Sequence, residues 1–336
     1  MTTPIQTLTV GPDEDGLRLD RWFKAHYPGL GFTHLQKLLR TGQVRVDGKR
    51  VDSATRLSPG QTVRVPPLPT DVKDTSPTGK LRPVTNAATA SKDADYLASL
   101  VLFEDDDLMV IDKPAGLAVQ GGSGLSRHVD QLLEALRDAK GNKPRIVHRL
   151  DRETSGCLVI AKKRSMAAEL ASSFRSRAAK KTYWALCAGV PKPRQGRVST
   201  FLAREEGDER MKVARHGDDG AAHALTYYAV VDQAGQGLSW LSLKPVTGRT
   251  HQLRAHTAHI GHPIVGDPKY FDKKDWDLPG GVQNRLHLLA RRIILPHPRT
   301  KSLLDVTAPL PPHMRQSWNL LGFDDSAYDP TEDHDD

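Results

Sequence analysis

The hydrophobic pattern of the first 66 residues predicts a small module of two helices and a hairpin. Apolar residues recur at helical intervals over 17–23. A second helix is expected over 34–40, with Thr33 as its N-cap and Gly42 just after its end. Residues 43–51 then alternate as a hairpin around Asp47 and Gly48, a pair typical of a type I′ turn.

From residue 100 onward the pattern becomes a mixture of short apolar strands and amphipathic helices. We expect strands over 101–104, 108–112, 117–119, 146–147, 157–161 and 182–190, and helices over 129–136, 165–179 and 250–260. Several consecutive strands have the short connections of antiparallel hairpins, and the sequence contains no internal repeat. The fold class is therefore expected to be α+β or mixed α/β.

The two patterned regions are separated by a segment without a periodic apolar face. It contains four prolines among Thr, Ser, Ala and Asp, and at about thirty residues it is long for a connection inside one domain. The last thirteen residues are acidic and are expected to be a disordered tail. The sequence thus predicts an N-terminal module over 1–66, a flexible linker over 67–98, a second domain over 99–323 and an acidic tail over 324–336.

Composition excludes several classes of protein. The chain has 336 residues, and its two cysteines, Cys157 and Cys187, are too few for a disulfide framework or a cysteine-built zinc site. No stretch approaches the roughly 18 consecutive apolar residues of a membrane span, and the N-terminus does not resemble a secretion signal. We therefore expect a cytoplasmic protein without membrane contact.

The charge distribution favours a polyanionic partner. The net charge is +8, although the acidic tail alone contributes seven negative charges. Residues 16–66 hold ten lysines and arginines against three aspartates. A solvated surface would also explain such a run, but nucleic acid is favoured over a small acidic substrate. The candidate RNA-binding residues are Arg18, Arg21, Lys37, Arg40, Arg45, Lys49 and Arg50.

The densest group of reactive side chains is a polar loop between two expected buried strands, His148-Arg149-Leu150-Asp151-Arg152-Glu153-Thr154-Ser155-Gly156. Cationic and hydroxyl neighbours would keep Asp151 ionised, as a nucleophile requires. Spacing alone favours a salt-bridged turn in which Asp151 bonds to Thr154 or Ser155 as a helix cap.

The whole string resembles the signature loop of the RluA-type pseudouridine synthases. Lys113-Pro114 is similar to the first motif of that family, Lys181-Thr182-Tyr183-Trp184-Ala185 to its tyrosine strand, and residues 247–256 with Gly266-Asp267 to its third motif. The stretch over 16–66 resembles an S-four-type RNA-binding domain. Residues 121–126 are similar to the branch that acts on 23S ribosomal RNA.

This resemblance implies a fold, a reaction and a set of site residues. The fold would be a mixed, mostly antiparallel sheet with flanking helices, and the reaction would convert uridine to pseudouridine without a cofactor. Asp151 occupies the catalytic position, and Arg149 the position that fills the gap left by the flipped base. Tyr183 matches the residue that stacks on the uracil, and spacing alone would make it a core aromatic. Arg254 matches the basic partner of the aspartate, in the first turn of a helix capped by Thr250, with Arg249 as the competing candidate.

The sequence also permits a metal site and two other functions. His251, His256, His259 and His262 could suggest a metal site, but without a nearby carboxylate or thiol before Asp267 we predict polar packing and no metal. The rival functions are a transfer-RNA pseudouridine synthase and a non-catalytic ribosome-assembly factor. The expected partner is 23S ribosomal RNA, and the expected state is a monomer.

Overall fold

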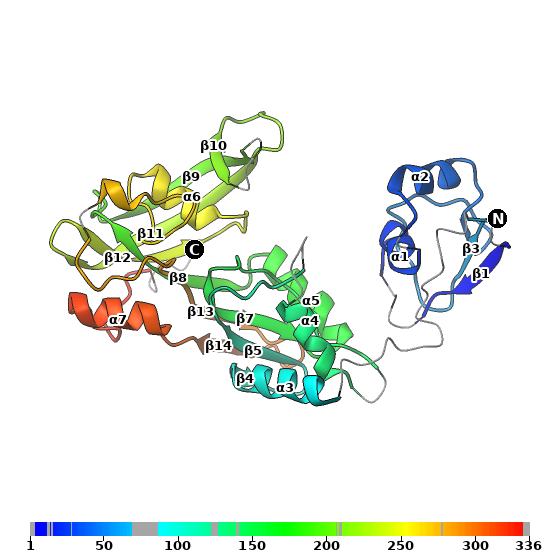
Figure 1. The fold of residues 1–336 in the computed structure, drawn as a ribbon, viewed down its shortest axis with the longest axis horizontal. Helices are drawn as coiled ribbons and strands as arrows, with labels where there is room; N and C mark the ends of the chain where they lie inside the picture. Colours follow the sequence, from blue (N-terminus) through cyan, green and yellow to red (C-terminus); the bar gives the residue numbers. More distant parts are fainter. Residues whose placement is uncertain are drawn as a thin grey trace. The chain divides into compact units, whose positions relative to one another are not determined.

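The computed structural model describes residues 4–331 apart from 12–13, 15, 28, 69–86, 122–126, 139–140, 206, 208–209 and 277. The chain divides into two units, Met1–Thr89 and Ala90–Asp336 (Figure 1). Each unit has its own buried hydrophobic cluster. Among the helices in these described ranges, none is long and apolar enough to cross a membrane.

The N-terminal unit contains the two helices and the tight turn that the sequence predicts. Its elements are α1 (Leu19–His26), α2 (Phe32–Arg40) and an antiparallel sheet of β1 (Gln6–Thr9), β3 (Thr62–Val65) and β2 (Arg45–Val46) in that order. Asp47 and Gly48 have φ values of 49° and 75°, as a type I′ turn requires. The predicted cap is wrong, because α2 begins one residue before Thr33 and has Gly31 as its N-cap.

The second unit is built on one large mixed sheet, which confirms the predicted fold class. Its strand order is β10-β9-β11-β12-β8-β13-β7-β5-β4, with β14 beside β13 and β6 beside β7. Every neighbouring pair is antiparallel except β13 and β7. The strands are β4 (Val101–Glu104), β5 (Leu108–Lys113), β6 (Arg145–Ile146), β7 (Ser155–Ala161), β8 (Lys180–Ala188), β9 (Gln195–Arg204), β10 (Met211–Ala214), β11 (Ala222–Ala234), β12 (Leu238–Pro245), β13 (Leu288–Pro296) and β14 (Leu303–Thr307).

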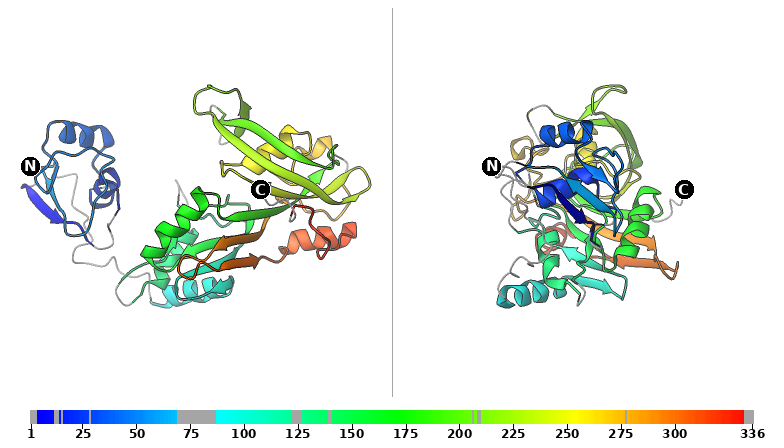
Figure 2. Two further views of the ribbon diagram at one scale, coloured as in Figure 1. Left: turned by 180° about the vertical axis from the view of Figure 1, so that it is seen from behind. Right: turned by 90° about the vertical axis from the view of Figure 1, so that its right-hand side faces the viewer.

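Helices cover both faces of this sheet (Figure 2). They are α3 (Ala87–Ala98), α4 (Val129–Leu132), α5 (Arg164–Arg175), α6 (Gln252–His259) and α7 (Pro312–Leu321), with short 3-10 turns over Leu133–Leu136 and Lys273–Asp275. Alternation along β8 assigns two of them: Trp184 belongs to the buried cluster that contains Trp318 of α7, whereas Ala185 belongs to the cluster that contains Leu253 of α6. The helices α6 and α7 therefore lie against opposite faces of the sheet.

The single parallel contact in the sheet depends on a glycine. Gly156, the second residue of β7, is paired with Ala290 of β13 and has φ of 104°. A Cβ atom at this position would lie 2.3 Å from the carbonyl oxygen of Ala290. Only glycine allows this approach, which brings the end of the polar loop against the centre of the sheet.

The predicted linker is wrong in its last third. Helix α3 occupies Ala87–Ala98, and its Leu97 is fully buried in a cluster with Val129 and Leu132. One buried leucine on an alanine-rich helix gives too weak an apolar period to detect. At the other end, Leu68 is buried in the core of the N-terminal unit. Residues 69–86 of the expected linker lie outside the described residues.

The predicted disordered tail is also wrong as far as residue 331. The side chain of Asp329 is buried and accepts hydrogen bonds from Trp184 Nε1 at 3.0 Å and from the Ser242 hydroxyl at 2.6 Å. These donors on the α7 face of the sheet hold an acidic segment that composition alone would leave in solvent. Residues 332–336 are outside the described part.

Three other boundaries differ from the predictions. Helix α5 ends at Arg175 rather than 179, because Arg177 has a left-handed φ of 66°. Helix α6 has His251, not Thr250, as its N-cap. The expected strand over 117–119 is reduced to an isolated bridge between Ala118 and His128.

Candidate active site

The polar loop between β6 and β7 is anchored by the first residue of its motif. His148 Nε2 accepts the backbone N–H of Val159 at 2.8 Å, and its ring stacks on Phe174 with centroids 4.2 Å apart. Burial, and to a smaller extent the charge of Lys181, lower the pKa of His148 to about 3. The imidazole is therefore neutral, as a ring nitrogen that accepts a hydrogen bond must be.

A buried lysine fixes the other side of the loop. Lys113, at the end of β5, donates to the carbonyl oxygens of Pro114, Leu117 and Arg152 at 2.9–3.0 Å. Burial lowers the pKa of Lys113 to about 7, against the opposing charges of Glu153, Asp151 and Asp112. The first motif thus holds the backbone immediately after Asp151.

The five candidate catalytic and supporting residues line a common pocket. The pocket has a volume of about 670 Å³, within the range of small-ligand sites. Its wall is assembled from the polar loop, α5, β8 and the segment that leads into α6. The predicted residues that line it are Arg149, Asp151, Tyr183, Arg249 and Arg254.

Asp151 lies beside Arg254, which is itself held by a second carboxylate. Arg254 Nη1 is 3.5 Å from Asp151 Oδ2, while its Nε and Nη2 donate to the two oxygens of Asp267 at 2.7 Å each. The side chain of Arg254 is 4% exposed and that of Asp151 is 27% exposed. His251 Nε2 lies 3.9 Å from the same Asp151 oxygen. The Asp151 carboxylate thus faces the pocket with an oriented cation behind it.

The structure separates the two competing arginines. Arg249 is exposed, and its Nε donates to the carbonyl oxygen of His223 at 3.0 Å. Its backbone N–H donates to the Gln252 side chain at 3.1 Å. Arg249 therefore belongs to the pocket rim, whereas Arg254 contacts Asp151.

Tyr183 is both a packed aromatic and part of the pocket wall. Its ring packs at the edges of two hydrophobic clusters, yet it also borders the pocket opposite the polar loop. Burial, and then the charge of Asp151, raise the pKa of the Tyr183 phenol. The hydroxyl is therefore protonated at any physiological pH.

Arg149 is an accessible residue of the pocket. It is exposed at the pocket and makes no ion pair within the part of the chain that the structure describes. Its guanidinium is available to an incoming ligand.

The histidines of the third motif have partners that favour the packing interpretation. His256 contacts the hydroxyl groups of Thr226 and Thr200, each at 2.9 Å, and so joins α6 to β11 and β9. Burial lowers the pKa of His256 to about 4. His262 Nδ1 lies 2.9 Å from the carbonyl oxygen of Ala188.

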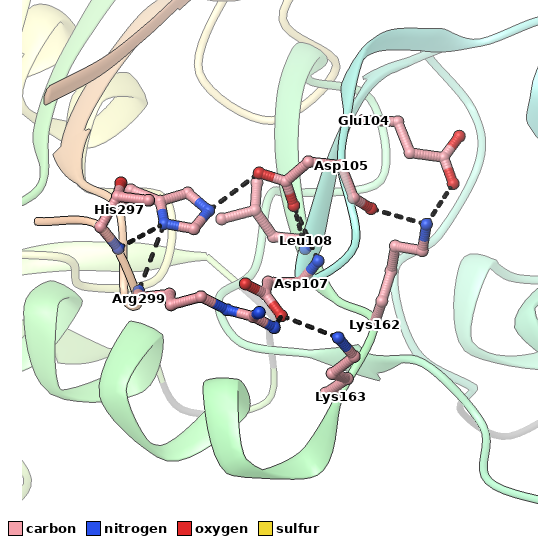
Figure 3. A network of polar contacts seen from close by, with 9 residues as sticks. Glu104, Asp105, Asp107, Leu108, Lys162, Lys163, His297 and Arg299 are labelled. Atoms are coloured by element: carbon pink, nitrogen blue, oxygen red, sulfur yellow. Dashed lines mark hydrogen bonds and ion pairs between the residues drawn. The ribbon is translucent and has the colours of Figure 1, made fainter. Parts of the chain in front are cut away.

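A separate cluster has the residue types of a metal site. Ligand atoms of Asp105, Asp107 and His297 lie within 4.8 Å of one another. Lys163 and Arg299 bind Asp107, and His297 contacts Asp105 (Figure 3). The distance from His297 Nε2 to Asp105 Oδ2 is 2.8 Å. His297 Nδ1 accepts two backbone N–H groups, so Nε2 carries the proton and donates to Asp105. These side chains join the turn between β4 and β5 to the turn between β13 and β14, so their polar atoms already have partners within the protein.

The basic residues of the N-terminal unit form an accessible set. Arg18 pairs with Asp20 at 2.7 Å, and Arg45 donates to the carbonyl oxygens of Gly42 and Gly48. All seven predicted residues are exposed, namely Arg18, Arg21, Lys37, Arg40, Arg45, Lys49 and Arg50.

Sequence reasoning assigned no role to two residues that organise the site. Lys113 and Asp267 occur in the quoted motifs. Lys113 binds three carbonyl groups, and Asp267 comes thirteen residues after its partner Arg254. Neither contact can be detected from the neighbouring sequence. The close approach of Gly266 to the backbone of Arg285, where a Cβ would lie 2.1 Å from its carbonyl oxygen, places Asp267. A glycine before an aspartate was the available signal.

The chain is similar to proteins of one known family. Residues 107–259 match the RNA pseudouridylate synthase family. The chain is 35% identical to ribosomal large subunit pseudouridine synthase C of Vibrio vulnificus, over 92% of this chain and 94% of that protein. It is also 35% identical to the protein of that name from Pasteurella multocida, over 94% of each chain.

Solved structures lead to the same family. Human RNA pseudouridylate synthase domain containing 4 superposes with a TM-score of 0.59 at 30% identity, covering 70% of this chain and 97% of that chain. Together with the similarity over nearly the full length, this shows that the chain belongs to the RluA-type family of RNA pseudouridine synthases.

Proposed function

We propose that this pseudouridine synthase modifies uridine in 23S ribosomal RNA and that Asp151 is its catalytic residue. The observation that carries the proposal is the pairing of Asp151 with Arg254 at the pocket, 3.5 Å apart. The relatives named above are synthases of the large ribosomal subunit, which supports ribosomal over transfer RNA.

The chemistry needs no external reactant. The N1–C1′ bond of uridine breaks, a C5–C1′ bond forms, and the proton lost from C5 is balanced by a proton gained at N1. A single ionised carboxylate against the nucleoside suits this isomerisation, since no redox step occurs. We therefore expect no cofactor. Arg254 would keep Asp151 ionised, because a nearby cation favours the charged form of a carboxylate.

The target base must leave the RNA stack before it reaches Asp151. Arg149 is exposed at the pocket, and a planar guanidinium can occupy the vacated position. Tyr183 borders the same pocket and would stack on the extruded uracil. The exposed basic residues of the N-terminal unit would hold the RNA through its phosphates.

We expect the enzyme to act as a cytoplasmic monomer. The predicted site residues lie together in one pocket of a single chain, which is compatible with a monomer. The proposed substrate is ribosomal RNA, and this supports a cytoplasmic location.

The test is pseudouridine mapping in total RNA from cells that contain the wild-type protein, Asp151→Asn or no protein. We expect sites in 23S RNA that disappear with Asp151→Asn, while RNA binding is retained. Glu153→Gln is a matched control, because Glu153 is in the same loop, lies outside the pocket lining and pairs with Arg152 at 3.5 Å. Sites confined to transfer RNA, or a near wild-type rate for Asp151→Asn, would contradict the proposal.

A further inference from the structure

Lys181 is a half-buried cation in the pocket wall, and no acidic residue pairs with it among the described residues. It is half-buried, lines the pocket and lies two residues before Tyr183 on β8, so the two side chains project from the same side of the strand. Burial lowers the pKa of Lys181, and no carboxylate opposes that effect. Lys113, by contrast, is offset by three acidic neighbours. The Lys181 backbone pairs with Ile293 of β13, but among the described residues its side chain has neither a hydrogen bond nor an ion pair.

The neighbouring wall supplies further cations. Arg175 ends α5, and Arg177 follows in the turn before β8; both are exposed and line the same pocket. Arg177 has φ of 66°, a left-handed conformation that is strained for a residue other than glycine. Strained backbone conformations are concentrated at functional sites, so the side chain of Arg177 is a candidate for a functional role.

The charge of the pocket lining is strongly unequal. Asp151 is the one acidic residue among the described residues that line it. Arg254 pairs with Asp267 and lies beside Asp151, and the described lining holds five further cations. They are Arg149, Arg175, Arg177, Lys181 and Arg249. His148, near Lys181, is neutral and therefore adds no positive charge to this set.

We propose that Lys181 and Arg177 form a phosphate-binding subsite, which holds the RNA backbone beside the extruded uridine. The inference rests on the proposed function. It assigns to Lys181 and Arg177, on the α5 side of the pocket, the role of positioning the RNA backbone. Residues i and i+2 of a strand are about 7 Å apart. A phosphate bound by Lys181 would therefore be within one nucleotide of a base stacked on Tyr183. Because Lys181 is partly desolvated, its interaction with a phosphate oxygen would be stronger than that of a surface lysine.

The first experiment compares Lys181→Met, Lys181→Arg and the matched control Lys180→Met. Lys180 is the preceding residue, is exposed and does not line the pocket. With transcribed 23S RNA, we expect Lys181→Met to lower kcat/KM by about 10- to 100-fold. The slope of log affinity against log salt should become shallower by about 0.7–0.9, the share of one phosphate contact. Lys181→Arg should restore most of both, and Lys180→Met should change neither.

The second experiment identifies the ligand group. Short RNAs around the mapped uridine carry a neutral methylphosphonate at one linkage at a time. At one linkage, wild-type enzyme should lose about as much kcat/KM as Lys181→Met loses on unmodified RNA, and the two changes together should lose no more. Losses that multiply at every linkage would overturn the proposal and indicate that Lys181 contacts the base. An unchanged salt slope would overturn it as well.

The outcomes separate this inference from the proposed function. Absence of pseudouridine formation by the wild-type enzyme would reject the function itself. An active wild-type enzyme whose Lys181→Met variant stays folded by thermal unfolding and keeps full activity would reject only the phosphate subsite.

Discussion

Arg254 contacts two carboxylates, and the buried carboxylate of Asp267 holds the guanidinium in place beside the more accessible carboxylate of Asp151. Two of its nitrogens donate to Asp267 at 2.7 Å, while the third reaches Asp151 at 3.5 Å. The guanidinium also lies over the ring of Tyr270, 5.3 Å from its centroid. Because its plane is held by Asp267 and Tyr270, the position of its charge beside Asp151 does not depend on substrate.

Asp267→Asn should therefore impair both stability and turnover. The substitution leaves the buried Arg254 without its charge partner, a change that typically costs 3–5 kcal/mol. We expect a large loss of unfolding free energy and a fall in kcat with little change in RNA affinity. Denaturant unfolding and single-turnover kinetics measure the two effects. Wild-type stability together with wild-type kcat would show that Asp267 does not position Arg254.

Tyr183→Phe separates stacking from the chemistry of the hydroxyl group. The variant keeps the ring, so RNA binding should be normal, and any loss of turnover is the contribution of the hydroxyl. Tyr183→Leu removes the aromatic face and should lose about 10- to 100-fold in kcat/KM, since base stacking contributes about 1–3 kcal/mol. Equal activity of the leucine variant and the wild type would exclude a stacking role.

Arg149→Ala should affect structured RNA more than an unstructured strand with the same uridine. Filling a vacant position in a stack matters only where a stack exists. The measurement is kcat/KM on a folded RNA and on a single strand. Similar losses on the two substrates would instead indicate a contact with Asp151 or with a phosphate.

Deletion of residues 1–70 should weaken binding to ribosomal RNA and flatten its salt dependence. Each lost phosphate contact lowers the slope by about 0.9. The deletion removes the whole core of the first unit through Leu68 and leaves α3 and the second unit intact. Circular dichroism checks that the remaining protein is folded. An unchanged salt slope would mean that the basic residues are only solvated.

His256 should make the protein less stable in acid. Its pKa is about 4 in the folded protein against about 6.5 in the unfolded chain. Between these values the unfolded chain binds more protons, so the free energy of unfolding falls as pH drops from 6.5 to 4, by about 3 kcal/mol for this group. His256→Gln removes the titration and can still bond to the two threonines. Its unfolding free energy should vary less over this range, and an identical pH profile would contradict the assignment.

The amino-acid sequence by itself determined the local elements and the identity of the site. Strands β4, β5 and β7 are short apolar runs bounded by polar turns, and they form within two residues of the predicted limits. The turn at Asp47–Gly48 follows from the φ values that these residues tolerate. The polar loop at His148–Gly156 and the third motif could be recognised because their chemistry is written in contiguous residues.

Tertiary structure decided what depends on distant partners. Helix α3 is an element of the second unit because Leu97 finds a buried cluster, and residues 324–331 are ordered because Asp329 meets donors on β8 and β12. Neither partner is near in the sequence, so neither outcome was predictable from local pattern.

The site shows the same division. Asp151, Tyr183 and Arg254 could be named from motifs, but the distances among them arise from the parallel contact of β7 with β13 and from α6 packing on the sheet. The unpaired charge of Lys181 and the pairing of Arg254 with Asp267 exist only in the folded chain. Sequence fixes which groups are present, whereas burial and the approach of remote segments set their charge partners and hence their chemistry.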